Sequence, residues 1–159
     1  YHSYDRLSQA HFVSVAPDSG PESVAIDAHG RLYTGVKEGL TIHFMPTDDP
    51  LTIFARLPPG CPLGLAFDQR QNLFVAYSPA GLLRISTEGH LETMLTMADG
   101  VPLRYADDLD IATDATTYLT DATSTFDPFQ HGGTDQNTRL DLLEHGGHGR
   151  LIESNSKTR

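Results

Sequence analysis

The chain begins its regular part with a pattern of hydrophobic and polar positions that is typical of a β-hairpin. Apolar residues flank the turn segment Asp27–Gly30, with Val24 and Ile26 before it and Leu32 and Tyr33 after it. Apolar residues that alternate with polar ones or come in short runs favour strands, and the glycine supplies the positive φ that a tight turn needs. The pattern predicts two antiparallel strands joined by this turn.

The same hairpin returns twice further along the chain, at Leu65–Ala76 and Leu109–Thr120. Aligning the copies on Ile26, Phe67 and Ile111 gives offsets of 67 − 26 = 41 and 111 − 67 = 44 residues. A repeat of about 40 to 50 residues made of short strands indicates a β-propeller blade, whereas no copy keeps the spacing of an amphipathic helix. The sequence therefore predicts an all-β fold, a β-propeller of about three blades.

Each of the first two copies has room for four strands, and proline-rich connections mark the limits of the blades. We expect blades at about residues 20–58, 62–99 and 104–159 of a single partial propeller domain, 1–159. The apolar patch His11–Val15 is expected to form a ring-closing strand within residues 1–19. The expected strands are Val24–Asp27, Arg31–Gly35, Leu40–Phe44 and Leu51–Ala55 in the first blade, and Leu65–Asp68, Leu73–Ala76, Leu82–Ile85 and Leu91–Leu95 in the second.

The third copy is interrupted by a polar stretch from Asp127 to His148 that is rich in Gly, Asp and His. We expect one or two helical turns at Arg139–Glu144, a strand at Gly149–Glu153, and then one strand still lacking from the blade. Propellers usually need four to eight blades to close, so three blades leave open flanks. We expect either a fragment of a longer protein or a half propeller that completes its ring by self-association, most simply as a two-fold dimer.

Composition narrows the classes of partner. The 11 Lys and Arg against 21 Asp and Glu give a formal net charge of −10, which disfavours nucleic acid and anionic membrane surfaces. No apolar run is long enough to span a bilayer and no basic-then-apolar leader is visible, so the chain is expected to be soluble, in an unknown compartment. The single cysteine, Cys61, excludes an intrachain disulfide.

Several short motifs follow one another along the chain. They are Gly20-Pro21-Glu22-Ser23 with Tyr33-Thr34-Gly35, Pro62-Leu63-Gly64-Leu65 with Gly81-Leu82-Leu83, Asp108-Leu109-Asp110 with Tyr118-Leu119-Thr120-Asp121-Ala122-Thr123, and Gly149-Arg150-Leu151. In this order they resemble the N-terminal half of the strictosidine synthase-like family, which includes proteins similar to the adipocyte plasma-membrane-associated protein. That family belongs with the gluconolactonases and paraoxonases among six-bladed calcium-binding propellers. The resemblance implies three of six blades.

The same resemblance implies roles for acidic residues. Glu22 matches a glutamate that ligates calcium or another divalent ion in the metal-dependent relatives, and a carboxylate is a suitable hard ligand. Asp107 matches a position that is usually asparagine in the family; aspartate keeps the oxygen ligand but loses an amide donor. We therefore expect Glu22 and Asp107 as metal ligands, calcium as the cofactor, and Asp108 and Asp121 as substrate-binding or supporting residues. The catalytic residue stays unassigned.

The residues alone leave plainer roles open. Glu22 follows a proline at the start of a strand and is compatible with a solvated turn residue. Asp108 is compatible with a side chain that hydrogen-bonds the backbone of the turn, and Asp121 with one that supports the channel end of its strand or the following loop. Functionally, the resemblance favours a calcium-dependent hydrolase of lactones or esters, with a small-molecule lactone or ester as substrate. The alternatives are a non-catalytic half propeller or assembly module, and an enzyme that condenses an amine with an aldehyde.

Overall fold

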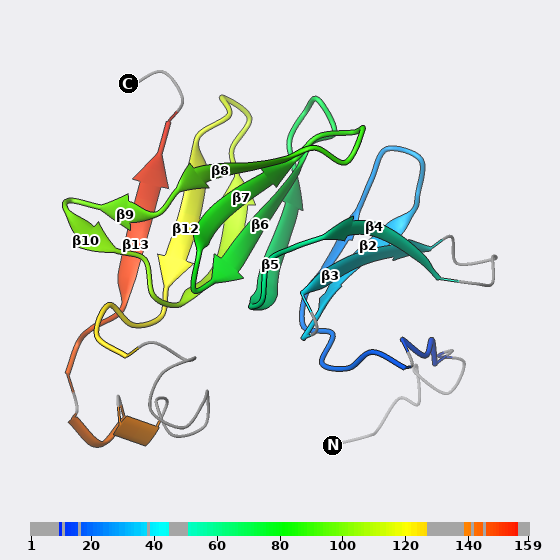
Figure 1. The fold of residues 1–159 in the computed structure, drawn as a ribbon. Coiled ribbons are helices and arrows are strands. Elements are labelled where there is room, and N and C mark those ends of the chain that lie inside the picture. Colours follow the sequence, from blue (N-terminus) through cyan, green and yellow to red (C-terminus); the bar gives the residue numbers. More distant parts are fainter. Residues whose placement is uncertain are drawn as a thin grey trace, which may run out of the picture.

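The computed structural model describes residues 10, 12–15, 17–37, 39–44, 51–126, 139–140, 142–144 and 146–155. Its strands form three antiparallel sheets that stand side by side, with a small hairpin between the second and the third (Figure 1). The first sheet has the order β1-β2-β3-β4, the second β5-β6-β7-β8, the third β11-β12-β13, and β9 pairs with β10. Strand follows strand as nearest neighbour within each sheet, which is how a propeller blade is built.

The strand bounds follow the predicted repeat. They are β1 (Val24–Ile26), β2 (Leu32–Val36), β3 (Leu40–Phe44), β4 (Thr52–Arg56), β5 (Cys61–Phe67), β6 (Leu73–Ser78), β7 (Gly81–Ile85), β8 (Leu91–Leu95), β9 (Met97–Ala98), β10 (Val101–Pro102), β11 (Ala106–Ile111), β12 (Thr117–Asp121) and β13 (Arg150–Ser154). The last residue pair before the turn is equivalent in the three inner hairpins: Ile26↔Leu32, Phe67↔Leu73 and Ile111↔Thr117. The repeat and the propeller fold predicted from the sequence are thereby confirmed.

The three inner turns share one backbone conformation. The left-handed region is occupied at equivalent positions, with φ of 80° at Gly30, 64° at Gln71 and 70° at Ala115. The amide of each of these residues donates to the carbonyl three residues earlier, at 3.0, 3.0 and 2.9 Å respectively. Only the first copy places a glycine there, so the other two turns hold a side chain in a conformation that L-residues disfavour.

Neighbouring turns are also joined to one another. The Ala28 amide donates to Gln71 Oε1 at 2.6 Å, which links the first turn to the second. Gln69 Nε2 donates to the Thr113 carbonyl at 2.8 Å and links the second turn to the third. Two glutamines of the middle blade therefore hold the turns of all three sheets at one end of the molecule.

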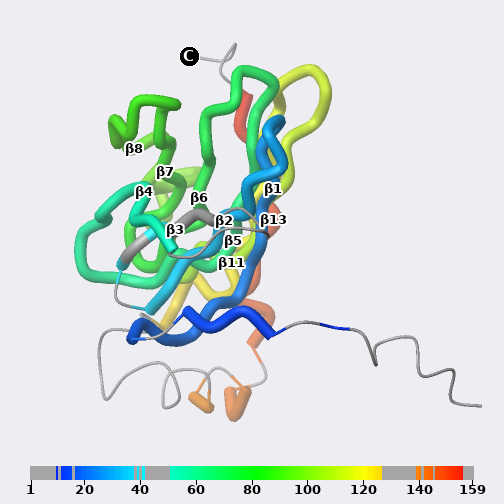
Figure 2. The backbone as a smooth tube through the Cα atoms, turned by 90° about the vertical axis from the view of Figure 1, so that its right-hand side faces the viewer, coloured from blue at the N-terminus to red at the C-terminus, as the bar shows by residue number. Residues whose placement is uncertain are grey.

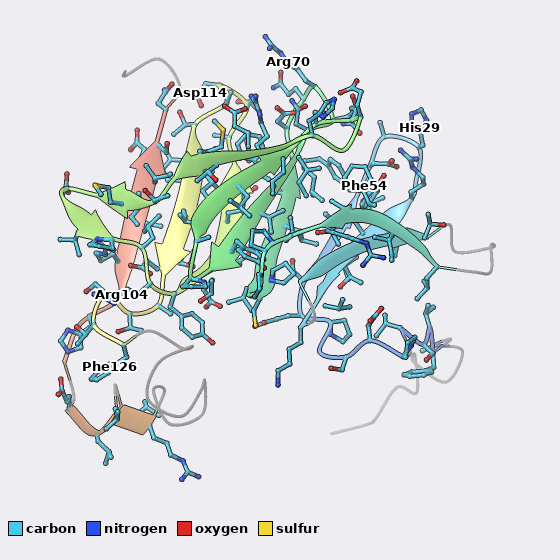
Figure 3. All side chains as sticks on the ribbon, in the orientation of Figure 1. His29, Phe54, Arg70, Arg104, Asp114 and Phe126 are labelled. Carbon is cyan, nitrogen blue, oxygen red and sulfur yellow. The ribbon has the colours of Figure 1, made fainter. Side chains whose placement is uncertain are left out.

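Apolar side chains fill the spaces between adjacent sheets, as Figure 3 shows for Phe54 between the first and second. The buried residues between these two sheets are Ala25, Tyr33, Ala55, Leu65, Leu73, Val75, Tyr77, Leu83 and Ile85. Those between the second and third sheets are Ala76, Leu82, Leu103, Ala106, Leu109, Leu119 and Ile152. Burial of these side chains is the main stabilising contribution available to the fold.

The outer faces of the first and third sheets carry exposed apolar side chains. On the first sheet Val24 is 60% exposed, Ile26 63% and Ile53 43%, and on the third Tyr118 is 40% and Leu151 74% exposed. Apolar residues in these numbers on a sheet face normally pack against another element. The structure therefore presents two flanks of the kind that a neighbouring blade covers.

Three features differ from the sequence prediction or complete it. Residues 12–15 form no strand, and Phe12 is 92% exposed. A ring-closing strand needs a partner in the blade that it completes, and none of the described sheets extends to this segment, so the strand expected at His11–Val15 stays a prediction. The stretch at the limit between the second and third expected blades contains the β9–β10 hairpin, which the sequence did not predict. Residues 139–140 and 142–144 are helical, as predicted.

The described helical residues are too few for a membrane span: no helix among them is long and apolar enough to cross a bilayer.

A groove of about 720 Å³ lies between the second and third sheets at their turn end, lined among others by Arg70, Phe74, Met94 and Asp114. Figure 3 shows Arg70 and Asp114 at this end and Arg104 at the opposite end of the molecule.

Candidate functional site

The inner strands β1, β5 and β11 lie next to one another, and their beginnings meet at the end of the molecule opposite the turns (Figure 2). Backbone packs closely on backbone there. A Cβ atom added at Gly64 would lie 2.7 Å from Asp108 Cα and 2.9 Å from the Asp107 carbonyl oxygen, and one added at Gly35 would lie 2.6 Å from the Pro62 carbonyl oxygen. Glycine is required at both positions, because a side chain at Gly64 would force β5 and β11 apart and one at Gly35 would force β2 away from β5.

In two blades, a β-bulge interrupts the strand pairing at this end. The register of β5 against β6 shifts between Pro62 and Gly64, and that of β11 against β12 shifts between Ala106 and Leu109. Bulges re-aim side chains and are common beside functional sites. Two blades therefore carry the irregularity at the same place in the repeat.

The repeat arithmetic places both predicted metal ligands at this one position. Leu63 and Asp107 differ by 107 − 63 = 44 residues, and Glu22 and Leu63 by 63 − 22 = 41, the offsets of the hairpins themselves. Glu22, Leu63 and Asp107 are thus the same position in three successive blades. Two blades place a carboxylate there and the middle one a leucine that is 9% exposed.

The two carboxylates are close enough to affect each other. Partial burial raises the pKa of Glu22, and the negative charges of Asp107 and Asp108 raise it further. Burial and the charge of Asp108 likewise raise the pKa of Asp107. Glu22 and Asp108 are exposed and Asp107 is partly buried. Neighbouring like charges favour either a bound proton or a bound cation.

The other two predicted residues have different surroundings. Asp108 is exposed; its amide donates to Thr120 Oγ1 at 3.0 Å, and its Oδ1 accepts from the Leu109 amide at 2.9 Å. Asp121 is fully buried on β12 and pairs with Arg150, so its carboxylate is not open to a ligand. The charges of Asp107 and Asp108 thus act on Glu22, whereas Asp121 is buried in an ion pair with Arg150.

The donor set suits a hard divalent cation in kind, because carboxylate oxygens are its preferred ligands. In number the set is partial. Within the part of the chain that the structure describes, no three His, Cys, Asp or Glu side chains gather closely enough to hold a metal ion. Glu22 and Asp107 would supply only two of the several oxygen ligands that such a cation takes.

Two tyrosines near the site were not singled out by the sequence analysis. Burial raises the pKa of Tyr105, and so do the charges of Asp107, Glu22 and Cys61, which places the phenol beside the acidic pair. Burial and the charge of Cys61 raise the pKa of Tyr77 to about 12, and its hydroxyl donates to the Pro58 carbonyl. Tyr105 could have been found from its place two residues before Asp107.

The sequence analysis named Arg150 only as part of a motif and did not predict its contacts. Its guanidinium donates to Asp121 Oδ2, through Nε at 3.1 Å and through Nη2, and to the Pro102 carbonyl at 2.8 Å. These partners are 29 and 48 residues away in the chain. No local pattern could have indicated them.

Known proteins resemble this chain both in sequence and in fold. The family model described as strictosidine synthase-like, N-terminal, matches residues 1–42. The protein STRICTOSIDINE SYNTHASE-LIKE 3 of Arabidopsis thaliana is 34% identical over 165 residues, which cover 88% of this chain and 40% of that protein. The chain therefore spans about two fifths of the length of this curated relative.

Solved structures agree with the fold. A gluconolactonase from Xanthomonas campestris matches with a TM-score of 0.66 at 16% identity, over 89% of this chain and 46% of its own. Regucalcin from Agrobacterium tumefaciens, a calcium-binding protein, matches with a TM-score of 0.54 at 17% identity, over 84% and 44% of the two chains. At these identities the likeness concerns the fold alone. Together, the repeat, the ordered motifs, the family model and the curated relatives show that this chain belongs to the strictosidine synthase-like family and corresponds to an N-terminal half of its propeller.

Proposed function

We propose that this chain is part of a calcium-dependent hydrolase that acts on lactones or esters, with Glu22 and Asp107 as two of the metal ligands. The observation that carries the proposal is their equivalence: the same position of the repeat, at the beginning of the inner strands, holds a carboxylate in the first and third blades. The raised pKa of each carboxyl indicates a charge that the described residues do not compensate.

Each residue has a definite part in this proposal. Glu22 and Asp107 hold the cation from the first and third blades, and Asp108 adds negative charge beside them while its amide stays bound to Thr120. A bound divalent cation supplies a Lewis acid that polarises the carbonyl of a lactone or ester. Tyr105 lies at the edge of the acidic pair and presents a protonated hydroxyl, a donor that suits a substrate oxygen.

The names of two structural neighbours support this choice. One neighbour is a gluconolactonase, and another, regucalcin, is a calcium-binding protein. The proposal transfers the reaction class and the metal to this chain and leaves the natural substrate undefined.

Calorimetric titration with calcium alone tests the metal ligands. We expect the wild-type chain to bind calcium weakly, with a Kd on the order of 10⁻⁴–10⁻³ M, because it supplies few ligands. Glu22→Gln and Asp107→Asn should abolish the binding heat. Asp110→Asn is the matched control, since it removes the same charge from β11 at a residue three positions away. Equal loss in all three variants, or no heat from the wild type, would reject the site.

Activity needs a separate test on a longer protein that contains these residues. A panel of lactones and aryl esters, with and without calcium, should show hydrolysis that Glu22→Gln and Asp107→Asn abolish. Calcium binding without any turnover would keep the metal site and remove the hydrolase proposal.

We also propose that the exposed flanks associate with further blades, from the same polypeptide or from a second copy. Val24 and Ile26 on one flank and Leu151 on the other are between 60% and 74% exposed. Sedimentation of the 17.4 kDa chain tests self-association, for which we expect a dimer. A stable, cooperatively folded monomer would contradict it.

A further inference from the structure

We propose that Arg150 is a positioning residue for the candidate site: by clamping Asp121 it sets the path of the segment that delivers Asp107 to the beginning of the inner strands. The inference deepens the proposed function. It rests on that function only for the role of Asp107 as a metal ligand.

The first part of the clamp is the guanidinium of Arg150. It spans from the Asp121 carboxylate to the β9–β10 hairpin, where Nη1 donates to the carbonyls of Ala98 at 3.3 Å and Val101 at 3.4 Å, and Nη2 to that of Pro102 at 2.8 Å. Arg150 and Asp121 face each other as paired residues of β13 and β12. The planar, multiply donating guanidinium is suited to such a set of partners, and an ammonium group could reach only part of it.

The second part is the other oxygen of Asp121. Its Oδ1 accepts from the amides of Arg104 at 3.2 Å and Tyr105 at 2.7 Å, and the Tyr105 carbonyl accepts from the Ala122 amide at 2.8 Å. The Asp121 carboxylate and the Ala122 amide therefore hold the amide and the carbonyl of Tyr105, two residues before Asp107. Because this carboxylate is fully buried, loss of its cationic partner would leave a charge with only two backbone donors.

The position of the bulge gives the clamp its effect on the site. Ala106 pairs with Asp121, and regular pairing resumes only at Leu109. Asp107 and Asp108 lie between these two points, where the backbone pairing is interrupted. After the bulge, Thr120 Oγ1 holds Asp108, since it accepts from the Asp108 amide at 3.0 Å and donates to the Asp108 carbonyl at 3.3 Å. Before the bulge, Asp121 holds the amides of Arg104 and Tyr105, so the direction of Asp107 depends in part on the Arg150–Asp121 pair.

Hydrogen exchange of single amides separates positioning from general stability. In Arg150→Met we expect the Asp108 amide to exchange about 10-fold faster, the effect of losing hydrogen bonds to a charged group, while Leu119 in the same sheet and Val75 in the neighbouring one change little. Arg84→Met is the matched control: Arg84 also lies on the third strand of its blade and pairs with a neighbouring-strand carboxylate, Glu92. It should leave Asp108 unchanged.

Arg150→Lys should rescue the exchange of Asp108 in part, since it keeps the charge beside Asp121 and loses most of the carbonyl contacts. Exchange that rises by the same factor at Asp108, Leu119 and Val75 would show a purely structural role and overturn the proposal. Failure of both Arg150 variants to fold would do the same.

Titration with calcium alone adds a second readout. If the wild type binds calcium, Arg150→Met should weaken the affinity about 10-fold and Arg84→Met should not. Unchanged calcium affinity in Arg150→Met would overturn the proposal. If the wild type binds no calcium, the metal site of the proposed function fails, and the exchange of the Asp108 amide alone decides whether Arg150 positions this segment.

Discussion

The left-handed residue in the third inner turn offers a sharp test of the repeat. Ala115 has a φ of 70°, is exposed, and occupies the position at which the first turn has Gly30. We predict that Ala115→Gly stabilises the protein, because it relieves a side chain in a disfavoured conformation without removing a described contact of that side chain.

The expected size follows from two opposing effects. A non-glycine residue in the left-handed region costs roughly 1–2 kcal/mol. Glycine gives back about 0.4–1 kcal/mol, because it gains more freedom in the unfolded chain than alanine does. The free energy of unfolding should therefore rise by about 0.5–1 kcal/mol, or about 1–4 °C in Tm for a chain of this size.

Urea unfolding of both proteins measures the difference, with the midpoint expected to rise at an unchanged slope. Ala28→Gly is the control, because Ala28 lies exposed in the equivalent turn of the first blade and is not in the left-handed region. That variant should lose stability, and Gly30→Ala should lose about what Ala115→Gly gains. A decrease for Ala115→Gly would refute the equivalence of the turns.

Three further predictions concern charged and apolar positions. Glu22→Gln and Asp107→Asn should each raise Tm at pH 7 in the absence of divalent ions. Because the pKa of each group is raised in the folded state, the stabilising contribution of its protonated form is fully present at low pH and is lost as the pH rises through that pKa. Melting temperatures measured from pH 4 to 8 would show this loss or disprove it. Burial opposes ionisation of Asp27, yet hydrogen bonds from Arg31 and His29 lower its pKa, so its contribution should be lost as pH falls through that lowered pKa. Asp27→Ala should cost about 1.5–3 kcal/mol in urea unfolding near neutral pH, and a cost unchanged at pH 2 would contradict this. Leu63→Asp should add a third carboxylate at the repeat position and enlarge the rise in Tm that calcium causes; Leu65→Asp, in the inter-blade core, should only destabilise.

The inner hairpins were predictable because their determinants are local. Turn chemistry and strand-forming residues sit within a dozen positions of each other, so the order of residues alone suffices to align Ile26, Phe67 and Ile111. The equivalence of Glu22 and Asp107 follows from the same alignment, since Glu22 lies four residues before Ile26 and Asp107 four residues before Ile111. The bulge that re-aims Asp107 could not be predicted from the sequence. Bulges depend on how two strands pair, which single residues do not specify.

Contacts between distant segments account for what sequence reasoning missed. The role of Asp121 depends on Arg150, and the carbonyls that Arg150 also binds belong to a hairpin where only a connection was expected. These are tertiary effects that override local propensity.

The ion pair between Asp121 and Arg150 also has a consequence for folding during synthesis. Asp121 leaves the ribosome 29 residues ahead of its partner, an interval of roughly 1.5–6 s at typical rates of translation. Until Arg150 arrives, burying the Asp121 carboxylate is costly, so the third sheet is expected to stay open while the first two already have their cores. The beginning of β11, and with it Asp107, is thus among the last parts of this half propeller to reach its final form on a growing chain.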